Sequence, residues 1–134
     1  MTALVVAAAV IEREVEIGGE RVAQFLLTRR QLGVHLAGLW EFPGGKCEPG
    51  ETLHSCLARE IREELAADIQ IGPKILATDH EYPDRRVELH FFRCALRNNP
   101  TPQQGQDMRW VWRSELPALP VPPADEALIR LLVG

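Results

Sequence analysis

The sequence predicts a mixed α/β fold in which helices pack on a sheet. Segments with the apolar runs or the alternation typical of strands lie before and after one amphipathic helical segment, and a second helical segment ends the chain. This order of strands, helix, strands and helix favours a mixed sheet with helices packed on it, a single layered α/β or α+β unit. A length of 134 residues fits one domain, residues 1–134, that buries a sizeable core.

The first third of the chain is expected to form strands that lead into a glycine-rich turn. Its apolar and alternating segments are short and are separated by glycine or by polar residues. In order, we expect a buried strand at 4–11, a hairpin at Gly18 and Gly19, a strand at 22–28, a loop at 31–39 that carries His35, and a short extended stretch at 40–43.

A helix over residues 52–66 is the most clearly patterned element. Its apolar residues recur every four positions and so form one stripe that can face a core: Leu53, Leu57, Ile61 and Leu65.

The second half is expected to return to strands and to end in a helix. Proline near the first turn favours the start of that last helix, and its apolar residues Leu128, Ile129, Leu131 and Leu132 are available for the core. In order, we expect strands at 69–78 and 86–96 with a turn at 79–84 between them, a polar loop at 98–106, a short strand at 109–112, and a helix from about 122 to 133.

Composition and charge exclude several classes of protein. Hydrophobic residues make up 46% and charged residues 25% of the chain, which is ordinary for a globular protein and argues against disorder. The formal net charge of -4 gives no attraction of the whole protein to nucleic acid, so we expect a free nucleotide as partner and no direct contact with a duplex. The apolar run near the N-terminus, about nine residues long, has no basic region before it, which indicates a buried strand and neither a signal peptide nor a membrane span.

The cysteines predict a reducing compartment. Cys47, Cys56 and Cys94 form no CxxC pair and leave an odd count, which suits reduced thiols and a cytoplasmic protein. Cys47 lies in the glycine-rich turn without a recognisable base partner, so we interpret it as a bystander.

The helix at 52–66 also carries a cluster of carboxylates. Glu60, Glu63 and Glu64 stand at i, i+3 and i+4, so their side chains lie on one helix face and their charges repel. Arg59 compensates part of that charge, and a divalent metal can supply the rest. Oxygen ligands without a Cys or His pattern suit Mg²⁺, which is commonly held by one or two carboxylates, waters and substrate phosphates. A carbonyl near Gly44 can complete such a site, and the substrate is then expected to carry phosphates.

This segment resembles the Nudix box, GX5EX7REUXEEXGU, where U is aliphatic. Gly45, Glu51 and the run from Arg59 to Glu64 match it, whereas Ala66 stands where the family has glycine and Ala67 where it has an aliphatic residue. We expect a slightly altered turn there. The resemblance implies an α/β/α sandwich with a mixed sheet, a catalytic loop and helix, and Mg²⁺ as cofactor, with Mn²⁺ as a substitute. It also implies roles for these residues: Glu60, Glu63, Arg59 and Glu51 in catalysis, with Glu60 as the favoured base, and Gly44, Glu60, Glu63 and Glu64 at the metal.

The likeness continues outside the box to the MutT-like members that remove damaged nucleotides from the nucleotide pool. It covers the segments around 28–46, 81–85 and 122–126. It implies a nucleoside triphosphate pyrophosphohydrolase acting on 8-oxo-dGTP, as a monomer or homodimer, with these substrate-binding residues: Arg30, His35, Glu41, Phe42, Pro43, Gly44, Arg85 and Asp125.

Two departures leave alternatives open. Gln104 falls where some MutT-like members have a glutamate near the metal, which shifts the role of base to Glu60 or Glu63. Asp125 stands where the oxidised-guanine enzyme has asparagine, and it can also serve as the N-terminal cap of the last helix. An ionised aspartate accepts the exocyclic amino group of cytosine, whereas a protonated one can read 8-oxoguanine. The alternative that Asp125 opens is a (d)CTP or 5-modified-dCTP pyrophosphohydrolase. The resemblance to the family leaves two more, a noncatalytic nucleotide- or lesion-binding module and a hydrolase of nucleoside diphosphate sugars or dinucleotides.

Overall fold

The computed structural model describes residues 3–31, 33 and 36–134. Within them the chain forms a mixed sheet with the strand order β3-β2-β1-β6-β5, to which β4 adds on β1 and β7 on β2. The elements are β1 (Leu4–Ile17), β2 (Glu20–Arg29), β3 (Trp40–Glu41), β4 (Gly44–Lys46), α1 (Leu53–Leu65), β5 (Ile69–Tyr82), β6 (Arg85–Leu96), β7 (Met108–Trp112), the 3₁₀ turns η1 (Arg113–Ala118) and η2 (Pro123–Asp125), and α2 (Glu126–Val133).

The sheet is mixed because β1 pairs with its neighbours in both directions. It runs parallel to β6 from Leu4 opposite Val87 to Ile11 opposite Cys94. It runs antiparallel to both β2 and β4. The β1–β2 hairpin closes at two glycines with positive φ, Gly18 at 57° and Gly19 at 84°, a conformation that glycine adopts without steric cost.

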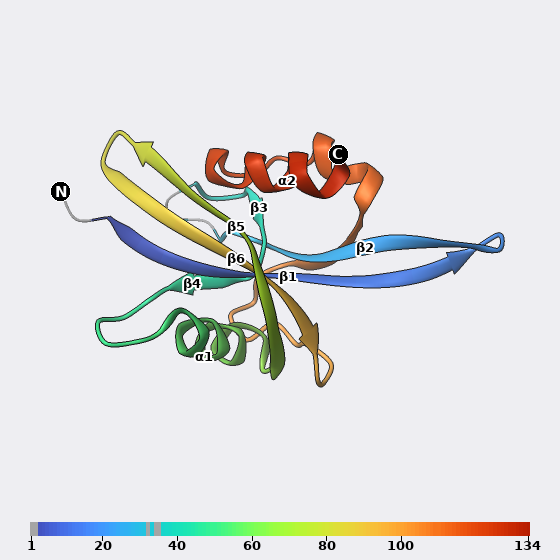
Figure 1. Cartoon of the computed structure of the whole chain (residues 1–134), viewed down its shortest axis with the longest axis horizontal. Coiled ribbons are helices and arrows are strands. Elements are labelled where there is room, and N and C mark those ends of the chain that lie inside the picture. Colours follow the sequence, from blue (N-terminus) through green and yellow to red (C-terminus); the bar gives the residue numbers. More distant parts are fainter. Residues whose placement is uncertain (1–2, 32, 34–35) are drawn as a thin grey trace.

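The helices cover opposite faces of the sheet, with α1 below it and α2 above it in Figure 1. The side chains of β1 alternate between the two resulting cores. Ala8 and Val10 pack with the α2 side, whereas Ala7, Ala9 and Ile11 pack with the α1 side. A strand buried on both faces must be apolar throughout, which is why this segment is a continuous apolar run. The α/β/α sandwich expected from the sequence is confirmed.

Helix α1 forms where its pattern predicted it. Leu57, Ile61 and Leu65 are fully buried, and Thr52 caps the N-terminus in a capping box with Ser55. Its C-terminus differs from expectation. Ala66 adopts the left-handed conformation at φ 49° and ψ 34°, so the turn that glycine supplies in the family forms here with alanine.

Three local expectations were wrong. Strand β1 continues to Ile17, and strand β2 begins as early as Glu20. Backbone pairing between the two strands extends the hairpin beyond the apolar run. The turn expected at 79–84 is only Pro83 and Asp84, since β5 pairs with β6 as far as Tyr82. Leu131 in α2 is 54% exposed and does not belong to the core.

The cysteines also differ from expectation. Cys47 and Cys56 form a disulfide with a Cα–Cα distance of 5.2 Å, and Cys94 is free and buried. The prediction of three reduced thiols was therefore wrong. The cause is tertiary, because the glycine-rich turn folds back onto the first turns of α1 and brings together cysteines nine positions apart.

None of the helices in the described residues is long and apolar enough to cross a membrane.

Candidate active site

The glycine-rich turn lies against α1 because its two glycines permit close approach. A Cβ atom on Gly45 would collide with the carboxylate of Glu60, and one on Gly44 would lie 2.7 Å from the Cα atom of Ala8 in β1. Larger residues would therefore separate β4 from both β1 and α1. The turn thus sets the distance between its backbone and the carboxylates of the helix.

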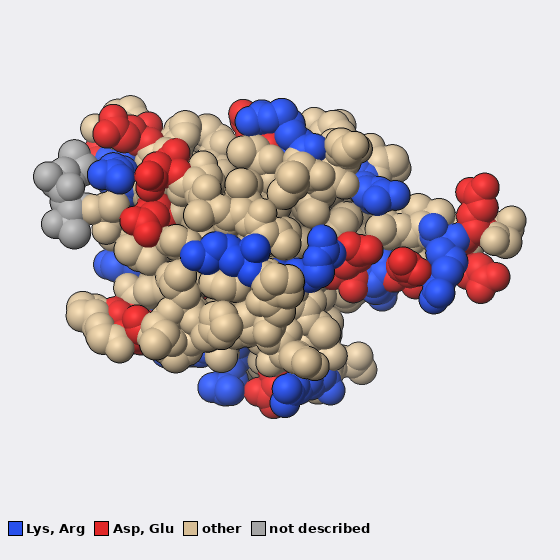
Figure 2. Space-filling model, viewed as in Figure 1, with Lys and Arg blue, Asp and Glu red and all other residues tan. Residues whose placement is uncertain are grey.

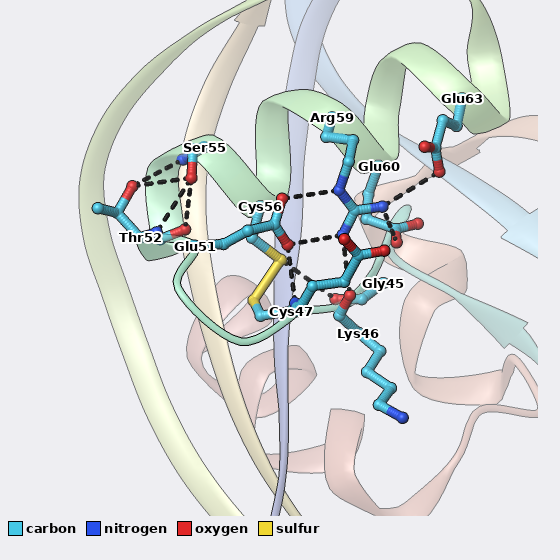
Figure 3. Close-up of polar contacts among 11 residues, drawn as sticks. Gly45, Lys46, Cys47, Glu51, Thr52, Ser55, Cys56, Arg59, Glu60 and Glu63 are labelled. Carbon is cyan, nitrogen blue, oxygen red and sulfur yellow. Dashed lines mark hydrogen bonds and ion pairs between the residues drawn. A yellow bond between two sulfur atoms is a disulfide. The ribbon is translucent and has the colours of Figure 1, made fainter.

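Arg59 joins the helix, the loop before it and the glycine-rich turn (Figure 3). Its Nε and Nη2 donate to the two carboxylate oxygens of Glu51, at 2.7 and 2.8 Å. Its Nη1 donates to Glu60 at 2.9 Å and to Glu63 at 3.1 Å. Its Nη2 also donates to the carbonyl oxygen of Lys46 at 3.1 Å. One guanidinium thus orients three carboxylates, and its hydrogen bonds lower the pKa of Glu51 to about 2.

Glu64 lies apart from this network, on the side of the sheet. Its carboxylate accepts the backbone N–H of Gly44 at 3.3 Å. Burial, followed by the negative charges of Glu41 and Glu60, raises the pKa of Glu64 to about 8. The single carboxylate face expected from sequence spacing is therefore divided, with Glu60 and Glu63 at Arg59 and Glu64 at Gly44.

The donors available for a metal are all oxygen atoms. Glu60, Glu63, Glu64 and the carbonyl of Gly44 lie along the contact between β4 and α1. In the described residues, no three Asp, Glu, His or Cys side chains converge closely enough to hold an ion by themselves. Magnesium requires fewer protein ligands than that, since water and substrate phosphates complete its coordination. The residues present therefore fit Mg²⁺.

A cavity of about 270 Å³ opens beside this region. It lies on the α2 side of the sheet, and its apolar lining comes from β1 and β6. Six residues expected to bind substrate or metal line it: Arg30, Glu41, Phe42, Gly44, Arg85 and Asp125. An apolar cavity with a few converging polar groups is the usual form of a small-molecule site.

Phe42 both packs in the core and lines the cavity. It is 3% exposed, and its ring meets Phe91 edge-on with centroids 6.1 Å apart. Arg30 and Glu41 form an ion pair of 2.8 Å at the wall. Burial raises the pKa of Glu41 in spite of this arginine. Arg85 also lines the cavity. Its side chain pairs with the exposed Asp84 at 3.3 Å.

Asp125 is the most deeply buried acid of the cavity, at 5% exposed. Burial, and next the negative charge of Glu41, raises its pKa to about 8, although a hydrogen bond from the backbone N–H of Phe42 acts in the opposite direction. The carboxyl is therefore mainly protonated at neutral pH. It makes no capping hydrogen bond to α2, so its side chain serves the cavity and not the helix terminus.

Some expected site residues are not brought to the cavity. His35 lies outside the described residues. Pro43 is buried next to the cavity, and its carbonyl oxygen accepts the N–H of Ala9 at 2.8 Å, so it supports the wall without lining it. Gln104 lies in the loop after β6, where its carbonyl oxygen accepts the side-chain amide of Gln31.

Two further residues were missed by sequence reasoning. The hydroxyl of Tyr82 lines the cavity region and accepts the N–H of Ala124 at 3.4 Å, which ties β5 to the segment before α2. Gln106 is buried, and its side chain accepts the N–H of Gln104 at 2.9 Å and donates to the carbonyl of Glu64 at 3.1 Å. A tyrosine in an assumed turn and a glutamine in a polar loop carry no sequence signal of burial.

Several known proteins resemble this chain in sequence and in architecture. The family model described as NUDIX domain matches residues 18–131. An 8-oxo-dGTP diphosphatase of Escherichia coli K12 is 34% identical over 110 residues, which are 81% of this chain and 85% of that protein. A CTP pyrophosphohydrolase of the same strain is 36% identical in an alignment of 136 positions that covers 100% of this chain and 94% of that protein.

A solved structure supports the same relationship. The solution structure of the E. coli ORF135 protein superposes with a TM-score of 0.77 at 34% sequence identity, covering 98% of this chain and 87% of that one. The overall architecture of this chain thus recurs in that protein. This chain belongs to the Nudix family.

Proposed function

We propose that this Nudix hydrolase is a Mg²⁺-dependent nucleoside triphosphate pyrophosphohydrolase that converts 8-oxo-dGTP to 8-oxo-dGMP and pyrophosphate. The observation that carries the substrate assignment is the buried carboxyl of Asp125 in a cavity beside the carboxylates of α1. The 34% sequence identity to an 8-oxo-dGTP diphosphatase supports the same substrate assignment. We further propose that residues 1–134 act as one domain in the cytoplasm.

The chain's own groups divide the work between the cavity and the helix. The apolar lining from β1 and β6 accepts the base, and Arg30 and Arg85 hold the phosphates at the wall and mouth. Bound Mg²⁺ would neutralise the charge of the phosphates and activate the attacking water. Glu60, with Glu63 next to it, takes the proton of that water. Arg59 keeps both carboxylates in position, because it donates to each of them.

A protonated Asp125 can distinguish 8-oxoguanine from guanine. Its carbonyl oxygen accepts the N7–H that only the oxidised base carries, while its O–H donates to O6. This is the pattern that an asparagine offers. Burial of Asp125 thus gives aspartate the hydrogen-bonding capacity of an amide.

A second candidate is the hydrolysis of cytosine nucleotides. A relative whose alignment covers the whole chain is a CTP pyrophosphohydrolase. An ionised Asp125 would accept a hydrogen bond from the exocyclic amino group of cytosine, and binding of that ligand would favour the ionised carboxylate. The two candidates therefore require opposite protonation states of one carboxyl.

The deciding experiment measures kcat/KM with Mg²⁺ for 8-oxo-dGTP, dGTP, dCTP, CTP, 5-methyl-dCTP and ADP-ribose, and identifies the products. We expect kcat/KM for 8-oxo-dGTP to exceed that for dGTP by roughly 100-fold, since a site built on paired hydrogen bonds rejects an analogue that lacks one partner. Higher values for dCTP or CTP would replace this assignment with the second candidate. ADP-ribose as the best substrate would reject both.

Substitution of Asp125 separates the two protonation states. If Asp125 acts in its protonated form, Asp125→Asn should turn over 8-oxo-dGTP as fast as the wild type at pH 7. Above pH 8, where the wild-type carboxyl ionises, the variant should turn over 8-oxo-dGTP faster than the wild type. The ratio of variant to wild type at each pH removes the titration of other groups. For an ionised aspartate that reads cytosine, the substitution instead lowers dCTP turnover and raises 8-oxo-dGTP turnover at pH 7.

Catalysis itself is tested at Glu63. Glu63→Gln keeps the shape of the side chain but removes its charge, so we expect kcat to fall by about 100-fold or more with nucleotide binding retained. Glu126→Gln, an exposed acid in the first turn of α2, is the matched control and should leave kcat unchanged. Turnover of Glu63→Gln within a few-fold of wild type would refute this metal and base assignment. Failure of the wild-type chain to hydrolyse any nucleotide that it binds would favour a noncatalytic binding module.

A further inference from the structure

We propose that Cys47 and Cys56 form a reversible thiol–disulfide exchange site that takes small disulfides such as oxidised glutathione and, when oxidised, fixes the glycine-rich turn to the catalytic helix. The bond joins the residue after β4 to the first turns of α1, and Figure 3 shows it next to the Arg59 network. In the cytoplasm proposed for this chain, disulfides are usually transient and respond to redox conditions.

The two sulfur atoms differ in accessibility, which sets the order of the exchange. Cys56 is fully buried, whereas Cys47 is only partly buried. Oxidation therefore begins when the Cys47 thiolate attacks one sulfur of the small disulfide, breaks its S–S bond and releases one thiol. Cys56 then attacks the Cys47 sulfur of the mixed disulfide and releases the second thiol. Two protein thiols are oxidised and one small disulfide is reduced to two thiols, and the reverse steps reduce the protein.

The third cysteine does not compete in this exchange. Cys94 lies on β6 and is 6% exposed. Burial raises the pKa of its thiol to about 12, so it carries almost no thiolate at neutral pH. Cys94 therefore serves as an internal control for the number of reactive thiols.

The disulfide connects segments that otherwise meet through weaker contacts. Lys46, the residue before Cys47, holds Arg59 through its carbonyl oxygen at 3.1 Å, and Gly44 donates to Glu64 at 3.3 Å. The Cys56 sulfur lies 3.7 Å from the carbonyl oxygen of Gly45. Reduction would replace the covalent connection with a weak S–H···O contact at this position. The turn would then keep its pairing with β1 but lose its covalent link to α1, and a catalytic arrangement loosened in this way loses rate.

The experiment compares full-length protein equilibrated with excess oxidised or reduced glutathione. After denaturation and alkylation, mass spectrometry should find one modified cysteine, Cys94, in the oxidised form and three in the reduced form. Hydrogen exchange of residues 44–52 should slow in the oxidised form. The melting temperature should be higher by roughly 5–10 °C, as expected for a short closed loop. These readouts do not depend on which nucleotide is hydrolysed.

The activity readout rests on the proposed function. With Mg²⁺ and the preferred nucleotide, we expect kcat/KM of the oxidised form to exceed that of the reduced form by three-fold or more. Cys47→Ser, at the partly exposed position, should behave as the reduced form in either buffer, and Cys56→Ala should agree with it. Cys94→Ala, the matched control, should keep the full response. Three alkylated cysteines after oxidation, or equal hydrogen exchange and equal kcat/KM in both forms, would overturn the proposal. A redox response in thiol count and hydrogen exchange without hydrolysis of any nucleotide would instead refute the proposed function.

Discussion

Asp125 gives the cavity a buried carboxyl that donates a hydrogen bond only when it is protonated. A surface aspartate would be ionised at neutral pH, but this one is buried and faces the negative charge of Glu41. Both effects disfavour the charged form, and burial is the larger. The same residue type can therefore offer a donor that its sequence identity does not suggest.

The pKa of Asp125 also makes a prediction about stability. Because its folded-state pKa is raised from 3.8 to about 8, its contribution to stability is complete below about pH 4 and is lost as the pH rises through 8. Asp125→Asn should remove this dependence. In urea unfolding, the difference between variant and wild type should grow in favour of the variant by an amount on the order of 5 kcal/mol from pH 4 to pH 8.5. A difference independent of pH would contradict the raised pKa.

Ala66 is a second residue whose local conformation predicts an effect. It holds φ at 49°, where an alanine Cβ is crowded and glycine is not. Ala66→Gly should raise the free energy of unfolding by roughly 0.5–1 kcal/mol, the relief of strain less the entropy that glycine adds to the unfolded chain.

The neighbouring alanine provides the control for that substitution. Ala67 is 1% exposed in the α1-side core and has no left-handed backbone. Ala67→Gly should lower the free energy of unfolding in the same chemical denaturation, because it removes a packed methyl group and adds unfolded-state entropy. Destabilisation by both substitutions would show that Ala66 carries no strain.

At the scale of elements, the planar guanidinium of Arg59 links α1 to the loop before the helix and to the glycine-rich turn. Arg59→Lys keeps the charge but cannot donate simultaneously to both oxygens of Glu51 and to Glu60 and Glu63. We expect kcat/KM to fall by about 10- to 100-fold, as for other residues that orient ligands. Arg62→Lys, whose exposed side chain pairs only with Asp68 among the described residues, should have no such effect. Equal losses for the two variants would mean that charge and not geometry is what Arg59 supplies.

The C-terminal end of α1 is held by the loop that follows β6. Gln103 and Thr101 donate backbone N–H groups to the carbonyls of Glu64 and Leu65. Gln106 adds its side-chain amide to the same carbonyl of Glu64. This loop therefore positions the end of the helix that carries the partly buried Glu64.

Substitution of Gln106 tests that role. Gln106→Leu leaves the N–H of Gln104 without its acceptor in a partly buried loop, and we expect a loss of about 1–3 kcal/mol in urea unfolding. Gln103→Leu removes only an exposed side-chain bond to Thr101 and should cost less than about 0.5 kcal/mol. Equal small effects would show that the loop does not depend on the buried amide.

At the scale of the whole molecule, the chain carries 15 basic and 19 acidic residues. On the face seen in Figure 2, basic and acidic side chains alternate along the projecting β1–β2 hairpin. Some of them pair, as Arg21 does with Glu14 at 3.0 Å and Arg93 with Glu12 at 3.0 Å. The net charge is -4, and the described residues on this face offer no continuous basic path for a phosphate backbone.

This distribution predicts the absence of duplex binding. Fluorescence anisotropy of a labelled DNA duplex should stay unchanged at micromolar protein and physiological salt, while the preferred nucleotide raises the melting temperature in the presence of Mg²⁺. Salt-sensitive binding of the duplex would contradict this prediction and would indicate a basic surface that binds the phosphate backbone.

Local pattern was sufficient for the elements that define the family. The stripe of α1, the apolar run of β1 and the spacing from Gly45 to Glu64 are properties of residues near one another in the sequence, so the sequence determined these elements. Its resemblance to the Nudix box indicated the sandwich. Strand ends were less predictable. Polar residues extend β1 and β5 because the partner strand supplies backbone hydrogen bonds, and those bonds do not depend on side-chain pattern.

Other features depend on distances between segments that are remote in sequence. The sequence determined which carboxylates this chain has, but only the tertiary structure placed Glu64 with Gly44, away from the Arg59 network. It also buried Asp125 beside Glu41 and joined Cys47 to Cys56. Protonation and disulfide formation depend on the solvent and neighbours around an atom, and these exist only once the sheet and its two helical layers have assembled.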